Sequence, residues 1–199
     1  VDDLYLPGML ILKGLHSPHA HARIKAVDTA AALALPGVEL ALTWKDLPQN
    51  RWGYANESYV LAEDFVQYVV QPILVVAASD EDTALRALDL VKVEYELLPA
   101  VFDPYLAMED GPDKVTDKPS NWFKFFGTQD VRKVRLGDVE KAFAEADHIF
   151  EDEFISSFQA HVSLETHVAV AQFDDRGRLL VHSPAQGVDW VHTTLSQTL

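Results

Sequence analysis

The residues whose types could perform chemistry are densest between positions 158 and 186 of this 199-residue chain. His161, Glu165 and His167 could bind zinc, because imidazole nitrogens and carboxylate oxygens are common ligands of that metal. On a strand these side chains and Ser163 would share one face, and on a helix His161 and Glu165 would do so. A buried, hydrogen-bonded pair of histidine and glutamate that shapes a loop is the simpler interpretation. We predict that pair and no metal site.

Gln186 offers a different chemistry. It follows Ser183-Pro184-Ala185 at the end of an expected strand, where its neutral side-chain amide could donate a hydrogen bond to an oxo group or a carbonyl. Judged by residue type and position alone, Gln186 is by default interpreted as a glutamine in a solvated loop.

A second group of histidines, His16, His19 and His21, precedes an expected strand. If the segment after Pro18 is extended, His19 and His21 point to the same side. However, Pro18 breaks the geometry, and no carboxylate is interleaved with the three imidazoles. We therefore predict a polar edge before a strand rather than a metal site.

Two pairs of carboxylates could be considered as a general acid and base. Glu151 and Glu153 would share one exposed face of an expected strand. The other pair belongs to Asp174-Asp175-Arg176-Gly177, which is typical of a hairpin turn. We predict structural roles for both pairs and assign no catalytic residue.

Several common motifs are absent from the sequence. No two of the nine glycines are spaced as G-x-G, and G-x-x-x-x-G-K and G-x-S-x-G do not occur. These absences exclude the dinucleotide fingerprint, the phosphate loop and the hydrolase nucleophile elbow within this chain.

The amino-acid composition limits the classes of binding partner and the cellular location that we expect. A formal charge of -15 repels phosphate backbones and anionic lipid, so we expect neither a nucleic acid nor a membrane as partner. The chain has no cysteine, which excludes disulfides and thiolate-held metal centres within it. No apolar stretch is long enough to cross a bilayer, and we expect a cytoplasmic protein.

The elements expected from apolar periodicity alternate irregularly, which favours the α+β class. Strands are predicted over residues 9–15, 22–27, 38–43, 73–78, 91–95, 131–135, 148–155, 168–173 and 178–183. Helices are predicted over 29–35, from 79 to about 91, over 139–146, and from 190 onward, with Asp28, Ser79 and Asp138 as caps. The stretch 45–64 reads as an irregular loop with exposed aromatics at Trp52, Tyr54 and Tyr59, and Trp122 and Phe126 form part of a later aromatic cluster.

We divide the chain into a first domain over residues 1–110, a linker over 111–130, and a second domain over 131–199. The linker is the polar stretch that contains glycine and proline between two blocks of regular pattern.

An ordered series of motifs runs through the chain: Tyr5-Leu6-Pro7-Gly8-Met9-Leu10, Ser17-Pro18-His19-Ala20-His21-Ala22-Arg23-Ile24, Leu35-Pro36-Gly37-Val38, Gln71-Pro72-Ile73, Val91 to Val101, Gly137-Asp138-Val139 to Asp147, Gln159 to His167, and Ser183-Pro184-Ala185-Gln186. This series resembles the molybdopterin-binding large subunit of the xanthine dehydrogenase and aldehyde oxidase family, over essentially the whole chain. The resemblance implies an α/β-hammerhead domain followed by the beginning of a molybdopterin-binding α+β domain.

The resemblance also implies chemistry. Family members hydroxylate purines, aldehydes or N-heterocycles with oxygen from water, and pass electrons to iron-sulfur clusters and usually FAD on other domains or subunits. The family glutamine that matches Gln186 hydrogen-bonds an oxo ligand of the molybdenum. The tract from His161 to Glu165 resembles a recurrent supporting element without a catalytic role.

The sequence departs from the family pattern at several positions. Val70 stands where the family usually has glycine before the glutamine of Gln71-Pro72, and Ala185 stands where threonine is frequent. Ser163 and Leu164 replace a common proline and methionine. The pterin-cradling G-G-x-F-G loop and the catalytic base glutamate of the family have no counterpart in these 199 residues.

We therefore expect a fragment or split subunit of a molybdenum hydroxylase that is inert alone. Its partners would be the remainder of the molybdenum-binding subunit and the iron-sulfur and FAD subunits or domains. The alternatives are a non-catalytic binding or assembly module with a hammerhead fold and, more weakly, a zinc protein that uses His161, Glu165 and His167.

Overall fold

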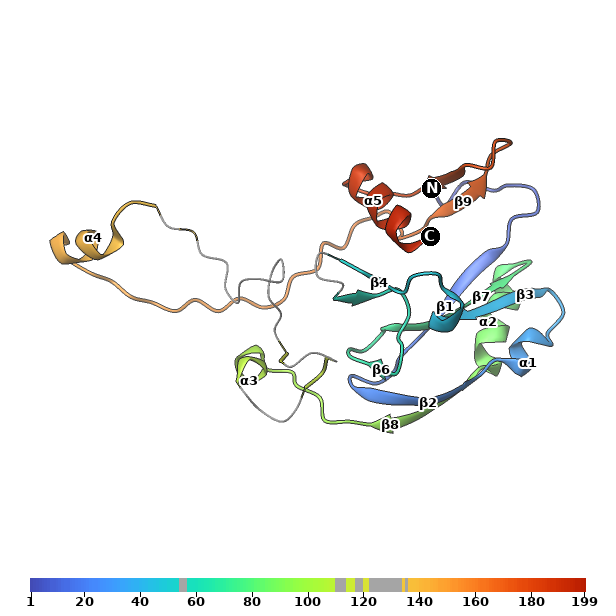
Figure 1. Cartoon of the computed structure of the whole chain (residues 1–199), viewed down its shortest axis with the longest axis horizontal. Coiled ribbons are helices and arrows are strands. Elements are labelled where there is room, and N and C mark those ends of the chain that lie inside the picture. Colours follow the sequence, from blue (N-terminus) through green and yellow to red (C-terminus); the bar gives the residue numbers. More distant parts are fainter. Residues whose placement is uncertain (54–56, 110–113, 117–119, 122–133, 135) are drawn as a thin grey trace. The chain divides into compact units, whose positions relative to one another are not determined.

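The computed structural model of the chain describes residues 1–53, 57–109, 114–116, 120–121, 134 and 136–199. The chain divides into two compact units. Figure 1 colours the chain along its sequence, from blue at the N-terminus to red at the C-terminus. The larger unit comprises residues 4–130 and 185–199, and the smaller unit comprises residues 1–3 and 131–184. The mixture of helices and strands confirms the predicted α+β class.

The centre of the larger unit is strand β7 (Pro72–Ala78). It lies between β1 (Ile11–His16) and β3 (Val38–Thr43) and is antiparallel to both, with Gly14 opposite Val75 on one side and Ala41 opposite Val76 on the other. Its unbroken apolar run is typical of a strand that is covered on both faces.

Two helices cover one side of β7. They are α1 (Ala30–Leu33) and α2 (Glu81–Leu90), and their small residues Ala32 and Ala87 share a buried cluster with Leu74 and Val76 of the strand. Alanines at this contact allow the helix backbones to approach the sheet closely. The predicted helices are confirmed, but two of their caps differ. Thr29 and not Asp28 is the N-cap of α1, although the Asp28 carboxylate accepts a hydrogen bond from the Ala30 amide at 2.9 Å, and α2 is capped by Asp80 and not by Ser79.

A second sheet has the strand order β6 (Phe65–Val66), β2 (Ala22–Asp28), β8 (Lys92–Leu97). Ile73 of β7 packs with Ala22, Ala62 and Val66 in a separate buried cluster, so neighbouring residues of β7 face two different cores. On the exposed side, the Glu96 carboxylate lies 2.7 Å from the Lys25 ammonium and 3.4 Å from Nε of Arg23.

The segment predicted as an irregular loop contains a 3₁₀ turn, η1 (Trp44–Asp46), and a small hairpin of β4 (Arg51–Trp52) and β5 (Ser58–Tyr59). The expectation that Trp52 and Tyr59 are exposed is wrong, because both are half-buried. Tyr54, Trp122 and Phe126 lie outside the described residues, so their expected exposure stays a prediction.

Two further helices belong to the larger unit. Helix α3 (Pro104–Met108) is capped by the Asp103 carboxylate, which accepts a hydrogen bond from the amide of Tyr105 at 2.8 Å. Helix α5 (Val188–Thr198) is the final helix predicted from the sequence, and it contacts β4.

The smaller unit contains α4 (Val139–Glu145) and an antiparallel pair, β9 (Val170–Phe173) and β10 (Leu179–His182). Asp138 caps α4 as predicted, since its carboxylate accepts a hydrogen bond from the Lys141 amide at 3.0 Å. The strand predicted over residues 148–155 is wrong: these residues form no helix or strand. Most of the strand predicted over 131–135 lies outside the described residues.

A tight turn between β6 and β7, the Gln67–Gln71 turn, holds a strained backbone. Val70 has φ 64°, a left-handed conformation that a β-branched residue seldom adopts. Its amide donates to the Ser17 carbonyl at 2.8 Å, and the Ser17 amide donates to the Gln71 carbonyl at 2.9 Å. The buried Gln71 side chain accepts from the Gln67 amide at 2.7 Å. These hydrogen bonds hold the backbone at position 70 in the left-handed conformation, which glycine adopts without steric cost.

In the described part of the chain, no helix combines the length and apolarity needed to cross a membrane.

Candidate functional site

Gln186 lies in the short connection between β10 and α5, in the strand–loop–helix order expected from the sequence. Its side chain is exposed, and among the described residues no hydrogen bond to it is found. Helix α5 begins after Gly187, whose position at the N-cap provides no side-chain acceptor for the first helical amides. The connection therefore presents an amide side chain beside uncapped backbone N–H groups.

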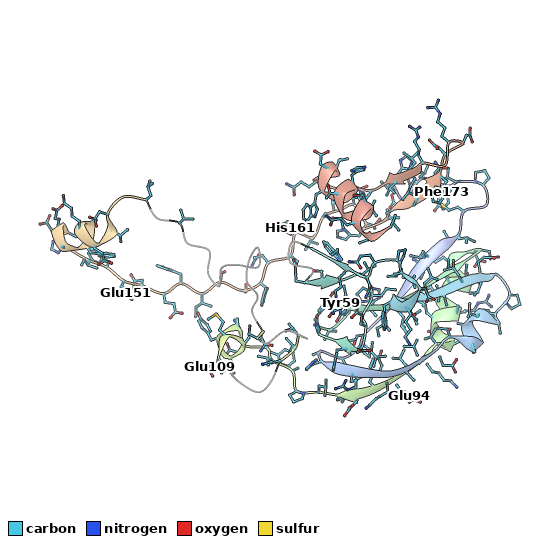
Figure 2. All side chains as sticks on the ribbon, viewed as in Figure 1. Tyr59, Glu94, Glu109, Glu151, His161 and Phe173 are labelled. Atoms are coloured by element: carbon cyan, nitrogen blue, oxygen red, sulfur yellow. The ribbon has the colours of Figure 1, made fainter. Side chains whose placement is uncertain are left out.

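The tract around His161 does not form the predicted buried pair. His161, Glu165 and His167 are all exposed, and residues 148–163 belong to no regular element. Figure 2 labels His161 on this segment. The prediction failed because burial of a histidine–glutamate pair requires covering structure, and the described chain supplies none at this place.

A zinc site finds no support in the described residues. No group of three or more histidine, cysteine, aspartate or glutamate side chains lies close enough together there to hold a metal ion. The zinc alternative therefore rests on the types of the side chains and not on their arrangement.

The first histidine group is divided by the fold. His21 is buried, and its Nδ1 forms a hydrogen bond with the carbonyl of Pro99, so its assignment to a polar edge is wrong. His19 stacks edge-on against Tyr95 with ring centroids 4.7 Å apart, and burial raises the pKa of that tyrosine. The contacts with Pro99 and Tyr95 join residues that are far apart in sequence, which local spacing cannot reveal.

One of the two carboxylate pairs has the structural role that was predicted, and the structural role of the other pair stays a prediction. Asp174 closes the β9–β10 turn, and hydrogen bonds from the backbone and side chain of Arg178 hold the pKa of its carboxyl below the usual value. Glu151 and Glu153 are exposed as expected, but they do not lie on a strand.

A pocket of about 290 Å³ in the larger unit was not predicted. At its wall the Arg51 guanidinium stacks on Tyr59, 4.4 Å from the ring centroid. The same guanidinium donates one hydrogen bond to the hydroxyl of Tyr59 at 2.6 Å and one to the carboxylate of Glu63 at 3.2 Å. Behind it the buried Asn50 side chain exchanges two hydrogen bonds with the Leu61 backbone. This network fixes the β4–β5 hairpin, and the Glu63 carboxylate balances the charge of Arg51.

Comparison with family models decides what this fold is. Residues 1–99 match the model described as aldehyde oxidase and xanthine dehydrogenase, a/b hammerhead domain. Residues 117–199 match the molybdopterin cofactor-binding domain. The chain belongs to the xanthine dehydrogenase and aldehyde oxidase family. The resemblance drawn from the sequence motifs is thereby confirmed, together with its hammerhead architecture and the molybdopterin cofactor of the family.

Known relatives extend the comparison. The chain is 37% identical to the carbon monoxide dehydrogenase large chain of Afipia carboxidovorans, with 98% of this chain and 26% of the relative covered. It is 34% identical to a probable xanthine dehydrogenase subunit of Bacillus subtilis, with 94% of this chain and 24% of the relative covered. A crystal structure of a Cu,Mo-CO dehydrogenase superposes with a TM-score of 0.81 at 33% identity, over 99% of this chain and 26% of that one. The chain thus spans about a quarter of the length of these family members.

The chemistry of one residue, Gln186, is compatible with the family cofactor. Gln186 carries a neutral amide that can donate to an oxygen of the molybdopterin group, and it lies within the matched cofactor-binding domain.

Proposed function

We propose that this chain is part of the molybdopterin-binding subunit of a cytoplasmic molybdenum hydroxylase, in which the larger unit is mainly scaffold and Gln186 contacts the cofactor. The observation that supports this most strongly is the position of Gln186. It is an exposed amide between β10 and α5, inside the segment that matches the molybdopterin cofactor-binding domain. When bound, the group would supply the redox chemistry that turns over a purine, aldehyde or N-heterocycle.

The role of this chain's own residues follows from their chemistry. The Gln186 amide N–H would donate to the cofactor and help to orient it, and its carbonyl oxygen would remain available as an acceptor. The described residues place no general base beside it, and we infer that residues 1–199 alone do not turn over a substrate. The proposed partners are the remainder of the molybdopterin-binding subunit and subunits or domains that carry iron-sulfur clusters and FAD, because the relatives are named as chains or subunits of larger dehydrogenases.

The test begins with the native gene product that contains this sequence, purified with whatever remains bound to it. Intact mass, molybdenum content and activity on xanthine and on an aromatic aldehyde are measured. The proposal expects stoichiometric molybdenum in a larger chain or complex. A complete product near 22.2 kDa without molybdenum would refute it and favour a binding or assembly module.

A substitution then tests Gln186 directly. Gln186→Ala should lower turnover by at least about tenfold, the range lost when a positioned hydrogen-bond donor is removed, while molybdenum content is kept. Gln159→Ala is the matched control, since Gln159 is another exposed glutamine of the same domain match. Equal activity of the two variants would show that Gln186 makes no functional contact.

A further inference from the structure

The centre of the Gln67–Gln71 turn exposes three consecutive apolar side chains, Tyr68, Val69 and Val70, which we call the apolar tip. They are 52%, 48% and 64% exposed. The turn connects β6 to β7, a strand whose side chains are mostly buried. Isolated exposed apolar residues occur on every protein surface, whereas contiguous ones are the usual mark of a contact surface.

The backbone of the apolar tip is held in a strained conformation. Val70 has φ 64°, in the left-handed region that a β-branched residue seldom adopts. Hydrogen bonds fix the turn: the Val70 amide donates to the Ser17 carbonyl at 2.8 Å, and the buried Gln71 side chain accepts from the Gln67 amide at 2.7 Å. Strain of this kind, imposed by the surrounding structure, is concentrated at functional sites. Folding stability alone would favour glycine at position 70, which indicates a use for the valine side chain outside the turn.

The charge pattern indicates the chemistry of the surface that would contact the tip. Charged residues make up 24% of the chain, yet residues 65–79 contain no aspartate, glutamate, lysine or arginine. Burial of β7 explains this absence from residue 72 onward, but it does not explain it in the exposed turn. Depletion of charge together with an exposed tyrosine is typical of the centre of a protein interface. A matching surface would therefore be apolar and uncharged.

The small size of the tip indicates where that surface lies. A stable complex between separate chains buries about 800 Å² on each partner, more than three partly exposed side chains supply. Two copies of this chain, each with a formal charge of -15, would also repel each other. A contact within one polypeptide can be smaller, because the covalent link supplies a high effective concentration. The chain covers 26% and 24% of two relatives, whose chains contain much more sequence that could cover such a tip.

We propose that the apolar tip inserts into an apolar pocket in the remainder of the molybdopterin-binding subunit, with Val70 as its most exposed side chain. This inference rests on the proposed function, because the occupant is the part of that subunit that these 199 residues do not include. The hydrogen-bonded turn fixes the tip before it docks, so little conformational entropy is lost on contact.

Photo-crosslinking of the native gene product that contains this sequence identifies the contact. Tyr68→p-benzoylphenylalanine places a photoreactive side chain in the tip, and mass spectrometry locates the linked peptide. We expect a link to the same polypeptide outside residues 1–199. The control is Tyr5→p-benzoylphenylalanine, at a tyrosine of the larger unit that is 76% exposed, and it should not link to that peptide. A link only to a second copy or to another subunit would overturn the proposal, and so would the absence of a link.

Cysteine labelling measures how well the tip is covered. The chain has no cysteine of its own, so Val69→Cys and Leu85→Cys each introduce one thiol into it, at positions that are 48% and 46% exposed. In the native product, iodoacetamide should alkylate the thiol at position 69 at least about tenfold more slowly than the thiol at position 85, because a docked side chain is shielded from solvent. Equal rates would refute docking.

A second substitution separates docking from the stability of the turn. Adding Val70→Gly to Val69→Cys should raise the alkylation rate about tenfold, because the buried valine side chain is lost from the contact. If the tip had only a structural role, relief of the strain at position 70 would leave that rate unchanged or lower it. An unchanged or lower rate would therefore overturn the proposal.

Molybdenum content distinguishes the failure of docking from the failure of the proposed function. A product that contains molybdenum but is alkylated equally at the two positions would refute docking and leave the proposed function intact. A product without molybdenum, in which position 68 links to the same polypeptide outside residues 1–199, would refute the proposed function and support the intramolecular contact.

Discussion

Val70, the strained residue in the Gln67–Gln71 turn, is a position where we expect glycine to make the protein more stable than alanine does. Replacing alanine by glycine at an ordinary exposed position destabilises a protein, because glycine is freer in the unfolded state, at a cost of about 0.5–1 kcal/mol. At position 70 we expect the reverse. Val70 has φ 64°, and any side chain with a Cβ costs about 1–2 kcal/mol in that left-handed conformation.

The magnitude follows from comparing Val70→Gly with Val70→Ala. Both substitutions remove most of the same valine side chain, which is 64% exposed, so the lost burial largely cancels between them. Relief of about 1–2 kcal/mol exceeds the entropic cost of about 0.5–1 kcal/mol, and the glycine variant should be the more stable by up to about 1.5 kcal/mol. The hydrogen bonds between this turn and Ser17 keep the backbone in place in either variant.

The neighbouring residue supplies the control. Val69 is 48% exposed and does not have a positive φ, so Val69→Gly should be less stable than Val69→Ala by about 0.5–1 kcal/mol. Free energies of unfolding are measured in urea by the fluorescence of Trp44 and Trp52, which lie in the same unit. If glycine lowers stability relative to alanine equally at both positions, position 70 carries no left-handed strain and the reasoning fails.

Three further predictions concern other parts of the fold. Asn50→Leu should lower the free energy of unfolding of the larger unit, measured in urea, by about 2–6 kcal/mol, since it leaves the buried amide and carbonyl of Leu61 unpaired at about 1–3 kcal/mol each; a loss below about 1 kcal/mol would contradict this. Hydrogen bonds from the backbone and side chain of Thr83 lower the folded-state pKa of Asp80 below its ordinary value of 3.8. Stability from Asp80 is therefore present above pH 3.8 and lost as the pH falls through the lowered pKa, so Asp80→Asn should flatten the acid limb of a Tm–pH curve. Equilibrium dialysis should find no stoichiometric zinc bound to the 199-residue chain and no difference for His161→Ala, because the described ligands are dispersed.

Local pattern was sufficient where the determinants of structure are close together in sequence. Strand β7 and helix α2 are marked by an apolar run followed by an acidic first turn, and both form as expected. The connection from β10 through Gln186 to α5 was likewise predicted, because a hairpin, a proline and a helical repeat follow one another within a few residues.

Prediction failed where the outcome depends on distant partners. His21 was expected at a polar edge, but its burial depends on Pro99, 78 residues away. The half-buried state of Tyr59 depends on the stacked Arg51. Residues 148–155 have the composition of a strand, yet a strand requires a second backbone to pair with, and the described chain offers none there.

The contribution of Gln186 to catalysis stays a prediction, since an exposed amide shows what it can donate but not what it contacts. The division into domains at 1–110, 111–130 and 131–199 also stays a prediction. Contact between α5 and β4 assigns residues 185–199 to the larger compact unit, while family similarity assigns them to the cofactor-binding domain.

The order of the first sheet also dictates when it can fold on the ribosome. Strands β1 and β3 do not pair with each other, and both wait for β7, whose last residue is synthesised 62 positions after the end of β1. At about 5–20 residues per second, the nascent β1 remains without a neighbour for about 3–12 s. Two apolar strands are therefore presented to solvent together before the third closes the sheet, which makes this stretch of translation the natural point for chaperone engagement and for aggregation during overexpression.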